Sequence, residues 1–318
     1  MGRRRRSRGR DVSGVIVLDK PKQMSSNEAV QQAKKLFFAQ KVGHSGSLDP
    51  LATGVLPLVF GEATKFSQYL LNSDKKYHAR LKLGVSTDSG DADGNVLHER
   101  AVVDISFHTV EKALEAFRGD IEQVPSMFSA IKHKGQPLYK LARQGIEIER
   151  KPRPVSVYSN VVVELSDNEL TLDLHCSKGT YVRSIAHDLG EVLGCGAHVI
   201  ELRRTMAGPF GEQDVVTFGA LDKAHQEKRL DHMMQPVSSM VRQWPSVILS
   251  DNTASYIKQG QPVVVPHAPT SGWVQLCEEV YVKKVAREDA MVPSQRFIGV
   301  GEILEDGRVA PRRLVISG

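Results

Sequence analysis

Residues 43–54 combine the side chains and the backbone freedom that a catalytic loop needs. They read GHSGSLDPLATG, with three glycines, a histidine, two serines, a threonine and a single carboxylate. Glycine permits positive φ and the close approach of another group, and the proline keeps Asp49 out of the helical region. Asp49 followed by proline is also typical of a helix N-cap. The spacing alone therefore leaves two interpretations open, a catalytic acid and a helix cap.

The longer string GHSGSLDPLATGVLPL, at residues 43–58, resembles the catalytic motif of the bacterial tRNA pseudouridine synthases that act on uridine 55, the TruB family. That family usually carries threonine at the position of Ser45 and often threonine or alanine at that of Ser47, so both departures are conservative. The resemblance runs from Gly14 to Leu314. It includes DKP at 19–21, GEATKF at 61–66, the strand around Tyr77, CSKGTYVRS at 176–184 and LRR at 202–204.

The resemblance implies that Asp49 is the catalytic carboxylate of a reaction that turns uridine into pseudouridine. In that reaction the N-glycosidic bond breaks, uracil turns, and C5 is joined to the ribose. Asp49 would bond to ribose C1′ or to the base, or stabilise the cleaved state, and the sequence leaves these routes open. In a closed pocket, desolvation raises the pKa of a carboxyl unless a cation opposes it.

Arg183 is the candidate for that cation. It lies in the first turn of a helix predicted over 179–194, where a cation opposes the helix dipole by about a few tenths of a kcal/mol. It also lies off the apolar stripe that contains Val182, Ile185 and Val192. An arginine in this position suggests a specific acid opposite, although without the resemblance a solvated arginine is the simpler interpretation.

Extrusion of a stacked nucleotide costs a few kcal/mol and needs groups that replace and hold the base. By resemblance, we expect His44 to fill the vacated space, Tyr77 to stack on uracil with a part in proton transfer at C5, and Leu202 to pack against the base. From pattern alone, these are a surface histidine, a core tyrosine and a strand residue. Lys20 and Lys65 are assigned to RNA phosphates or to support of the loop.

Composition is typical of a soluble protein of two domains: 318 residues, 41% hydrophobic and 25% charged. No apolar run approaches the roughly 20 residues of a bilayer span, and none near the basic start is long enough for a signal peptide. We therefore expect a cytoplasmic protein with no membrane partner. Three widely spaced cysteines fit reduced thiols. The formal charge of +5 falls to −1 without the six arginines of residues 1–10, so only local clusters argue for nucleic acid.

No metal site and no cofactor are expected. The stretch Asp88–Gly94 suggests a calcium loop, but aligning Gly94 with the required glycine places Ser89 and Arg100 at ligand positions that need acids. We interpret it as a turn. The eleven histidines show no ligand spacing, and the isomerisation needs no redox or metal chemistry.

Strand and helix patterns predict an α+β catalytic domain with a mixed, largely antiparallel sheet and flanking helices. A capping box at Ser25–Glu28 begins the first helix. Lys76, His78, Arg80 and Lys82 alternate with apolar residues, which predicts a half-buried strand with a cationic outer face that is solvated or suited to phosphates. Strands are expected at 15–18, 55–60, 77–83, 155–165, 169–176 and 198–204, and helices at 26–37, 63–70, 109–118 and 179–194.

Two further regions are expected to bind RNA. Residues 125–153 have no long apolar run, and residues 132–153 carry seven lysines and arginines against two glutamates, with Tyr139 among them. This predicts an RNA-binding insertion that is disordered without RNA; a basic surface loop is the alternative. Beyond Trp244, short strands, one of them at 262–266, predict a small β-barrel that resembles a PUA-type domain. The predicted divisions are a basic disordered tail at 1–10, a pseudouridine synthase catalytic domain at 11–245, and a PUA-like RNA-binding domain at 246–318.

These observations predict a monomeric, cofactor-free isomerase that converts uridine 55 in the T-arm of tRNA to pseudouridine. One alternative is a non-catalytic RNA-binding protein or tRNA-folding chaperone on the same fold. Another is a hydrolase that cleaves an N-glycosidic bond, but such enzymes usually use two carboxylates, and the loop supplies one.

Overall fold

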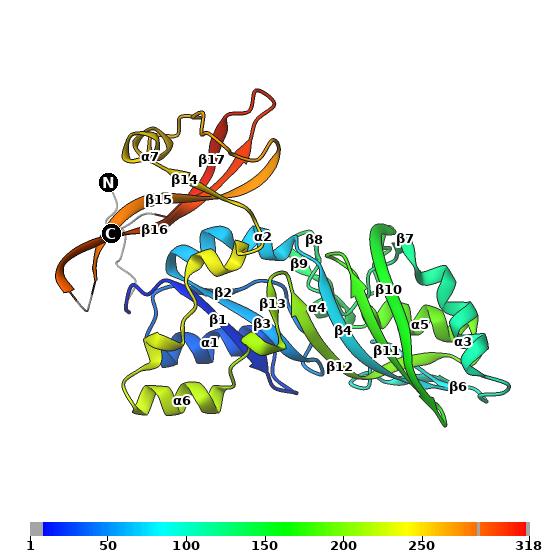
Figure 1. The fold of residues 1–318 in the computed structure, drawn as a ribbon. Helices are drawn as coiled ribbons and strands as arrows, with labels where there is room; N and C mark the ends of the chain where they lie inside the picture. Colours follow the sequence, from blue (N-terminus) through cyan, green and yellow to red (C-terminus); the bar gives the residue numbers. More distant parts are fainter. Residues whose placement is uncertain (1–8, 285–286, 316–318) are drawn as a thin grey trace.

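Two β-sheets organise the chain, a nine-stranded sheet from residues 14–211 and a four-stranded sheet from residues 246–314 (Figure 1). The structure, a computed structural model, describes residues 9–284 and 287–315. Most of the tail predicted to be disordered lies outside the described residues. Its last residue, Arg10, is described and forms an ion pair with Asp231.

The main sheet is mixed and mostly antiparallel, which confirms the predicted fold class. Its order is β1-β3-β12-β4-β11-β10-β7, with β2 beside β3 and β13 beside β12. Only the β3–β12 pairing is parallel, and it places Thr53 and Gly54 opposite Arg203 and Arg204. The strands are β1 (Gly14–Lys20), β2 (Val42–His44), β3 (Thr53–Phe60), β4 (Lys75–Leu83), β7 (Gly119–Gln123), β10 (Arg153–Ser166), β11 (Glu169–Cys176), β12 (Ala197–Ala207) and β13 (Phe210–Gly211).

Helices α1 (Ser26–Leu36), α3 (Phe107–Leu114) and α5 (Val182–Val192) lie against one face of this sheet (Figure 1) and contribute to its larger hydrophobic core. Leu221 and Ala224 of a further helix, described below, belong to the same core. The predicted capping box of α1 is present: the Glu28 carboxylate accepts from the Ser25 backbone N–H at 2.7 Å, and the Ser25 hydroxyl accepts from the Glu28 N–H. Val192 was placed on the apolar stripe of α5 but is 61% exposed, because the helix ends there.

The opposite face of the sheet is covered only at the β1–β3 end. There a second core includes residues of the 3₁₀-helix η1 (Gly61–Phe66), the short helix α2 (Ser67–Leu71) and η5 (Val237–Val241). The single helix expected at 63–70 is thus a 3₁₀ turn followed by one turn of α-helix. The remaining elements before the second sheet are β5 (Val85–Thr87), β6 (Val96–Glu99), η2 (Glu115–Phe117), η3 (Glu212–Asp214), α6 (Phe218–Gln226) and η4 (Leu230–Met233).

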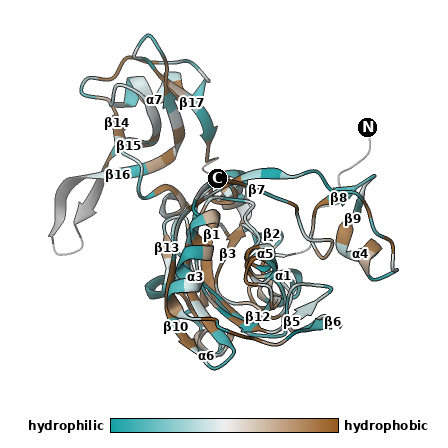
Figure 2. Ribbon diagram, turned by 90° about the vertical axis from the view of Figure 1, so that its right-hand side faces the viewer, coloured by the Kyte–Doolittle hydropathy of each residue, from teal (hydrophilic) through white to brown (hydrophobic). Residues whose placement is uncertain are grey.

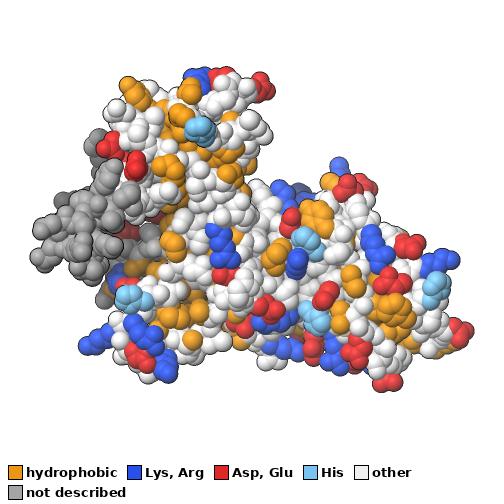
Figure 3. Space-filling view, in the orientation of Figure 1, with side chains coloured by type: hydrophobic (Ala, Val, Ile, Leu, Met, Phe, Trp, Pro, Cys, Tyr) orange, Lys and Arg blue, Asp and Glu red, His pale blue; other side chains and the backbone are white. Residues whose placement is uncertain are grey.

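Strand β4 does carry the four expected cations on the open face, and among the described residues all of them except Lys76 contact carboxylates. His78 contacts Asp173 at 2.7 Å, and Arg80 forms an ion pair with Glu169 on the neighbouring strand β11. Figure 3 shows charges of both signs mixed over this face of the sheet. The expected cationic surface is therefore largely neutralised by cross-strand carboxylates.

Residues 125–153 form a small folded lobe rather than the disordered segment that the sequence predicts. The lobe contains β8 (Lys132–His133), β9 (Gln136–Pro137) and α4 (Leu138–Ala142), and Figure 2 shows it to one side of the main sheet. It has an apolar cluster of its own around Met127, Leu138 and Leu141. These apolar residues are scattered along the segment and form no continuous run, so the sequence pattern did not predict a folded unit.

The C-terminal part is β-rich as predicted. Its sheet has the order β14-β15-β16-β17 and its own core. The strand expected at 262–266 is reduced to an isolated bridge between Val263 and Val309, because prolines at both ends cannot donate to a ladder. The elements are β14 (Ser246–Leu249), α7 (Asp251–Lys258), β15 (Gly272–Lys284), β16 (Arg287–Ile303) and β17 (Val309–Leu314).

Cys176, Cys195 and Cys277 are buried free thiols, as expected. Within residues 9–284 and 287–315, no helix has the length and apolar character needed to cross a membrane. The same residues contain no cluster of three or more histidine, cysteine or carboxylate side chains arranged to hold a metal ion.

Candidate active site

Asp49 lies on an irregular loop, residues 45–52, that joins β2 to β3. No helix follows it, so the helix-cap interpretation is wrong. Glycine is needed near both ends of the loop: Gly46, inside it, and Gly54, just after it in β3, have φ of +94° and +95°. A Cβ on Gly54 would lie 2.3 Å from the Arg204 carbonyl oxygen. The parallel pairing of β3 with β12 demands this close approach, and it fixes where the loop emerges from the sheet.

The backbone around Asp49 is tied to the first strand and helix. The Ser26 hydroxyl bonds to both the N–H and the carbonyl of Leu48, at 2.7 and 3.0 Å. The Pro50 carbonyl accepts from the Gln23 N–H at 2.7 Å and from the Lys20 ammonium at 3.4 Å. These contacts on either side of Asp49 leave its backbone little freedom.

Arg204 fixes the loop from the other side. The residue is 1% exposed, and its guanidinium donates to the carbonyls of Val55, Ser47 and Gly46, at 2.8, 3.3 and 3.2 Å. A buried cation that satisfies two carbonyls of the loop and one of β3 acts as an internal scaffold, because a buried carbonyl that loses its donor is costly.

We expect Arg204→Met to lower the free energy of unfolding by about 3 kcal/mol, because the buried carbonyls lose their donor. Urea unfolding measures this. The matched control, Arg80→Met, removes an exposed ion pair and should cost less than about 1 kcal/mol. Equal effects of the two substitutions would contradict the scaffold role.

Arg183 faces Asp49, as the sequence predicts. Its Nε lies 2.9 Å from the Asp49 carboxylate and 3.6 Å from that of Asp91. Its two terminal nitrogens donate to the carbonyls of Ser89 and Phe128, at 2.8 and 2.9 Å. The guanidinium is therefore held by backbone on one side and presented to carboxylates on the other.

Asp49 keeps 38% of its side chain exposed, whereas Arg183 is buried. Removal from bulk water raises the pKa of Asp49, the Arg183 charge opposes that rise, and the nearby Asp91 adds to it. A carboxylate that is partly removed from water and paired with a fixed cation is more basic than an aspartate in bulk water. This is suitable for a nucleophile or for stabilising positive charge.

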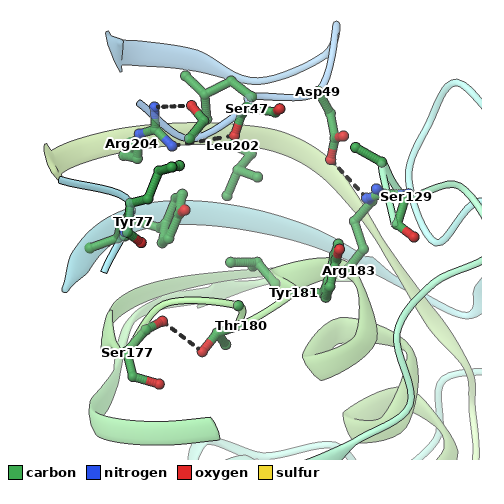
Figure 4. Close-up of a pocket in the computed structure, with 17 residues that line it drawn as sticks. Ser47, Asp49, Tyr77, Ser129, Ser177, Thr180, Tyr181, Arg183, Leu202 and Arg204 are labelled. Carbon is green, nitrogen blue, oxygen red and sulfur yellow. Dashed lines mark hydrogen bonds and ion pairs between the residues drawn. The ribbon is translucent and has the colours of Figure 1, made fainter. Parts of the chain in front are cut away.

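The pair opens into a cavity of about 280 Å³ (Figure 4). Figure 4 shows Asp49 and Arg183 at one end and Tyr77 and Arg204 at the other, with Leu202 between them. Tyr77 on β4 is directly opposite Arg204 on β12 in the antiparallel pairing of these strands. Burial raises the pKa of the Tyr77 hydroxyl. An ionisable carboxylate, an aromatic ring and an apolar side chain around one cavity suit a flat heterocycle attached to a sugar.

The other predicted site residues lie outside this lining. His44 ends β2, where its Nδ1 is buried without a hydrogen-bond partner among the described residues, and burial lowers its pKa. Lys20 is buried and bonds to the carbonyls of Met24, Pro21 and Pro50, and burial lowers its pKa to about 8. Lys65 forms an ion pair with Glu62 at 2.6 Å, away from the cavity.

Sequence reasoning missed Asp91 and Arg204. Asp91 was assigned to a turn, and the turn is correct, but its carboxylate is buried against Arg183, a pairing that sequence distance hides. The sequence did contain a signal for Arg204. It lies two residues after Leu202 on a predicted strand, so both side chains are expected on the same face as the site. The remaining lining residues that were not predicted include Lys75, Ser129, Ser177, Thr180 and Tyr181.

Three family models match consecutive parts of the chain. The N-terminal domain of TruB family pseudouridylate synthases matches residues 34–182. The tRNA pseudouridylate synthase B C-terminal domain matches residues 183–242, and the C-terminal model of pseudouridine synthase II TruB matches residues 245–280 and 291–315.

Curated relatives are similar over the whole chain. The tRNA pseudouridine synthase B of Tolumonas auensis is 50% identical over 327 residues, which cover 100% of this chain and 97% of that protein. The protein of the same name from Coxiella burnetii is 49% identical over 309 residues, 96% of each chain.

Two solved structures share the fold. A crystal structure of a Cbf5-Nop10-Gar1 complex aligns with a TM-score of 0.70 and 26% identity, over 96% of this chain and 84% of that one. The structure of an H/ACA RNP bound to a substrate RNA containing 2′-deoxyuridine aligns with a TM-score of 0.69 and 25% identity, over 96% and 85%.

A carboxylate held by an arginine at a cavity, on a mixed sheet shared with these proteins, defines an enzyme of the pseudouridine synthase class, an isomerase. Full-length similarity makes the assignment more specific. The chain belongs to the TruB family of pseudouridylate synthases.

Proposed function

We propose that this enzyme converts uridine 55 in the T-arm of tRNA to pseudouridine. The observation that carries the proposal is the Asp49–Arg183 contact of 2.9 Å at a cavity also lined by Tyr77 and Leu202. The relatives that are about half identical over the full chain are named tRNA pseudouridine synthases, which supports a tRNA substrate for this chain.

The reaction places clear demands on the cavity. The bond from N1 to C1′ breaks, uracil turns, C5 bonds to C1′, C5 loses its proton, and N1 gains one, so the mass does not change. Asp49 is placed to stabilise or bond to the electron-poor centre that forms on cleavage. Tyr77 stacks on the extruded base, and Leu202 packs against it and limits its movement. His44, at the loop's entrance, is proposed to contact the RNA that the uridine leaves.

A hydrolase is less consistent with this geometry. Asp91 does bring a second carboxylate near Asp49, but its Oδ1 accepts from Ser89 and from the Asp93 N–H, and it does not line the cavity. Glycoside hydrolysis usually needs two carboxylates on the substrate. Among the described residues that line the cavity, Asp49 is the only carboxylate.

We propose that the RNA is held by three parts of the chain. Residues 11–245 form the catalytic domain, the lobe at 125–153 covers the T-arm beside the cavity, and residues 246–318 form a PUA-like RNA-binding domain. We propose that the enzyme acts as a monomer in the cytoplasm, without a cofactor.

Lys132 and Lys151 on the lobe are exposed, and neither forms an ion pair within the described part of the chain. We expect each change to alanine to weaken tRNA binding and to reduce the slope of log affinity against log salt by about 1. The single-turnover rate at saturating RNA should stay unchanged. Binding titrations at several salt concentrations measure this, with Lys82→Ala on the open face of the sheet as control. An unchanged slope would remove the lobe from the interface.

The direct test is incubation with an unmodified T-arm stem-loop, followed by mass measurement and mapping of the product. The proposal predicts unchanged mass and a pseudouridine at the position of uridine 55. Release of free uracil would instead identify a hydrolase. Tight binding without any product would favour the non-catalytic RNA-binding alternative.

A further inference from the structure

An aromatic cluster joins the two sheets beside α2. The ring of Tyr69, on α2, lies 5.1 Å from that of Trp244 and 5.3 Å from that of Trp273, both in edge-on contacts. The two tryptophans stack at 5.6 Å. Trp273 belongs to β15 of the C-terminal sheet, so the cluster connects that sheet to the catalytic part of the chain. Figure 1 shows α2 directly between the two sheets.

Helix α2 has five residues and cannot be stable alone, because a helix nucleus costs more than so few hydrogen bonds return. Its position is therefore set by what packs on it. Leu70 is buried in the core. At its C-terminal end the buried Lys75 ammonium donates to the carbonyls of Leu70 and Leu71, at 3.2 and 3.0 Å, and to that of Ser73.

The same helix forms part of the catalytic cavity. Successive residues on a helix point about 100° apart, and here Tyr69 faces the tryptophans, Leu70 the core, and Leu71 the cavity. Leu71 and Lys75 both line the cavity that holds Asp49. Only Leu70 thus separates, along the chain, the contact with the C-terminal sheet at Tyr69 from the cavity wall at Leu71.

We propose that Tyr69, Trp244 and Trp273 are positioning residues, through which the C-terminal sheet holds α2 and so fixes the Leu71–Lys75 wall of the cavity. The C-terminal sheet then contributes to the rate of the reaction as well as to RNA binding. The kinetic part of this inference rests on the proposed function, whereas the structural part does not.

The ring of Tyr69 carries this role, not its hydroxyl. The hydroxyl oxygen is buried without a hydrogen-bond partner among the described residues, whereas the ring makes both contacts to the tryptophans. Tyr69→Phe should therefore behave as wild type. Tyr69→Ala should behave as Trp273→Ala.

The first test uses full-length protein without RNA. In Trp273→Ala, hydrogen exchange of residues 67–75 should rise about tenfold, because α2 loses an aromatic contact. Tyr256→Ala is the matched control, since it removes an exposed aromatic side chain from α7 in the same C-terminal unit and should leave residues 67–75 unchanged. Trp273→Phe keeps a ring and should restore most of the protection. If Trp273→Ala does not fold, Trp273→Phe is compared with the wild type in its place.

The second test is the single-turnover rate at saturating T-arm stem-loop. It should fall about tenfold in Trp273→Ala and recover in Trp273→Phe. If exchange at 67–75 and the saturated rate both stay at wild-type values while RNA affinity falls, the C-terminal sheet only binds RNA, and the inference is wrong. If the wild type makes no pseudouridine, the proposed function fails, and the exchange result still decides the structural inference.

Discussion

Asp49→Asn should reduce pseudouridine formation by about 10⁴-fold or more, because asparagine has the same shape but cannot supply negative charge or a carboxylate bond. The change removes one charge from the cavity and leaves the loop contacts of Leu48, Pro50 and Arg204 in place. We therefore expect RNA affinity close to that of the wild type. The measurement is a single-turnover assay with enzyme in excess, together with a binding titration of the same RNA.

The matched control is Asp93→Asn, an exposed carboxylate in the turn next to Asp91. It should leave both rate and affinity unchanged. Turnover by Asp49→Asn within about tenfold of the wild type would remove Asp49 from the chemistry, because loss of a reacting group costs far more than that.

Arg183→Lys is expected to lower the saturated rate by about 10²–10³-fold. Lysine keeps the positive charge but has a single nitrogen. It cannot replace at the same time the Nε contact of Arg183 with Asp49 and the bonds from the two terminal nitrogens to the carbonyls of Ser89 and Phe128. The same variant should change the pH profile. Arg183 holds down a pKa of Asp49 that burial raises, and the reaction requires the ionised form. The wild-type rate therefore falls as pH falls through that raised pKa, and weakening the arginine contact moves this acid limb to higher pH.

Asp91→Asn should shift the acid limb of the pH–rate profile in the opposite direction. It removes a like charge that raises the pKa of Asp49, so the acid limb should move to lower pH. Rates at saturating RNA between about pH 4 and 8 measure both shifts. Shifts of the same sign in the two variants would show that the limb belongs to another group.

The local parts of the site were predictable from the chain. The glycines around Asp49, the Pro50 that follows it and the early position of Arg183 on α5 are each visible in sequence, and the structure brings Asp49 and Arg183 into contact. The α+β class and the two strands expected at 155–165 and 169–176 also followed from residue patterns, and the structure pairs these strands as β10 and β11.

The rest depended on contacts between distant segments. Asp91 lies in a turn with an ordinary sequence, and its contact with Arg183 depends on α5, which is about 90 residues away along the chain. The lobe at 125–153 folds on a few scattered apolar residues, which a search for runs does not detect. The role of α2 could not be predicted from its own sequence either. Tyr69, Leu70 and Leu71 form one short apolar stretch, and only the folded chain shows that their side chains face the tryptophans, the core and the cavity respectively.

The central claim is that Asp49 breaks and re-forms the glycosidic bond of one uridine. It is tested most directly with an unmodified tRNA transcript that carries tritium at C5 of every uridine. Formation of the new bond at C5 releases that hydrogen, so the account predicts one equivalent of tritium in water per tRNA, a pseudouridine at position 55, and no release with Asp49→Asn. Absence of release by the wild type, or release accompanied by free uracil, would contradict it.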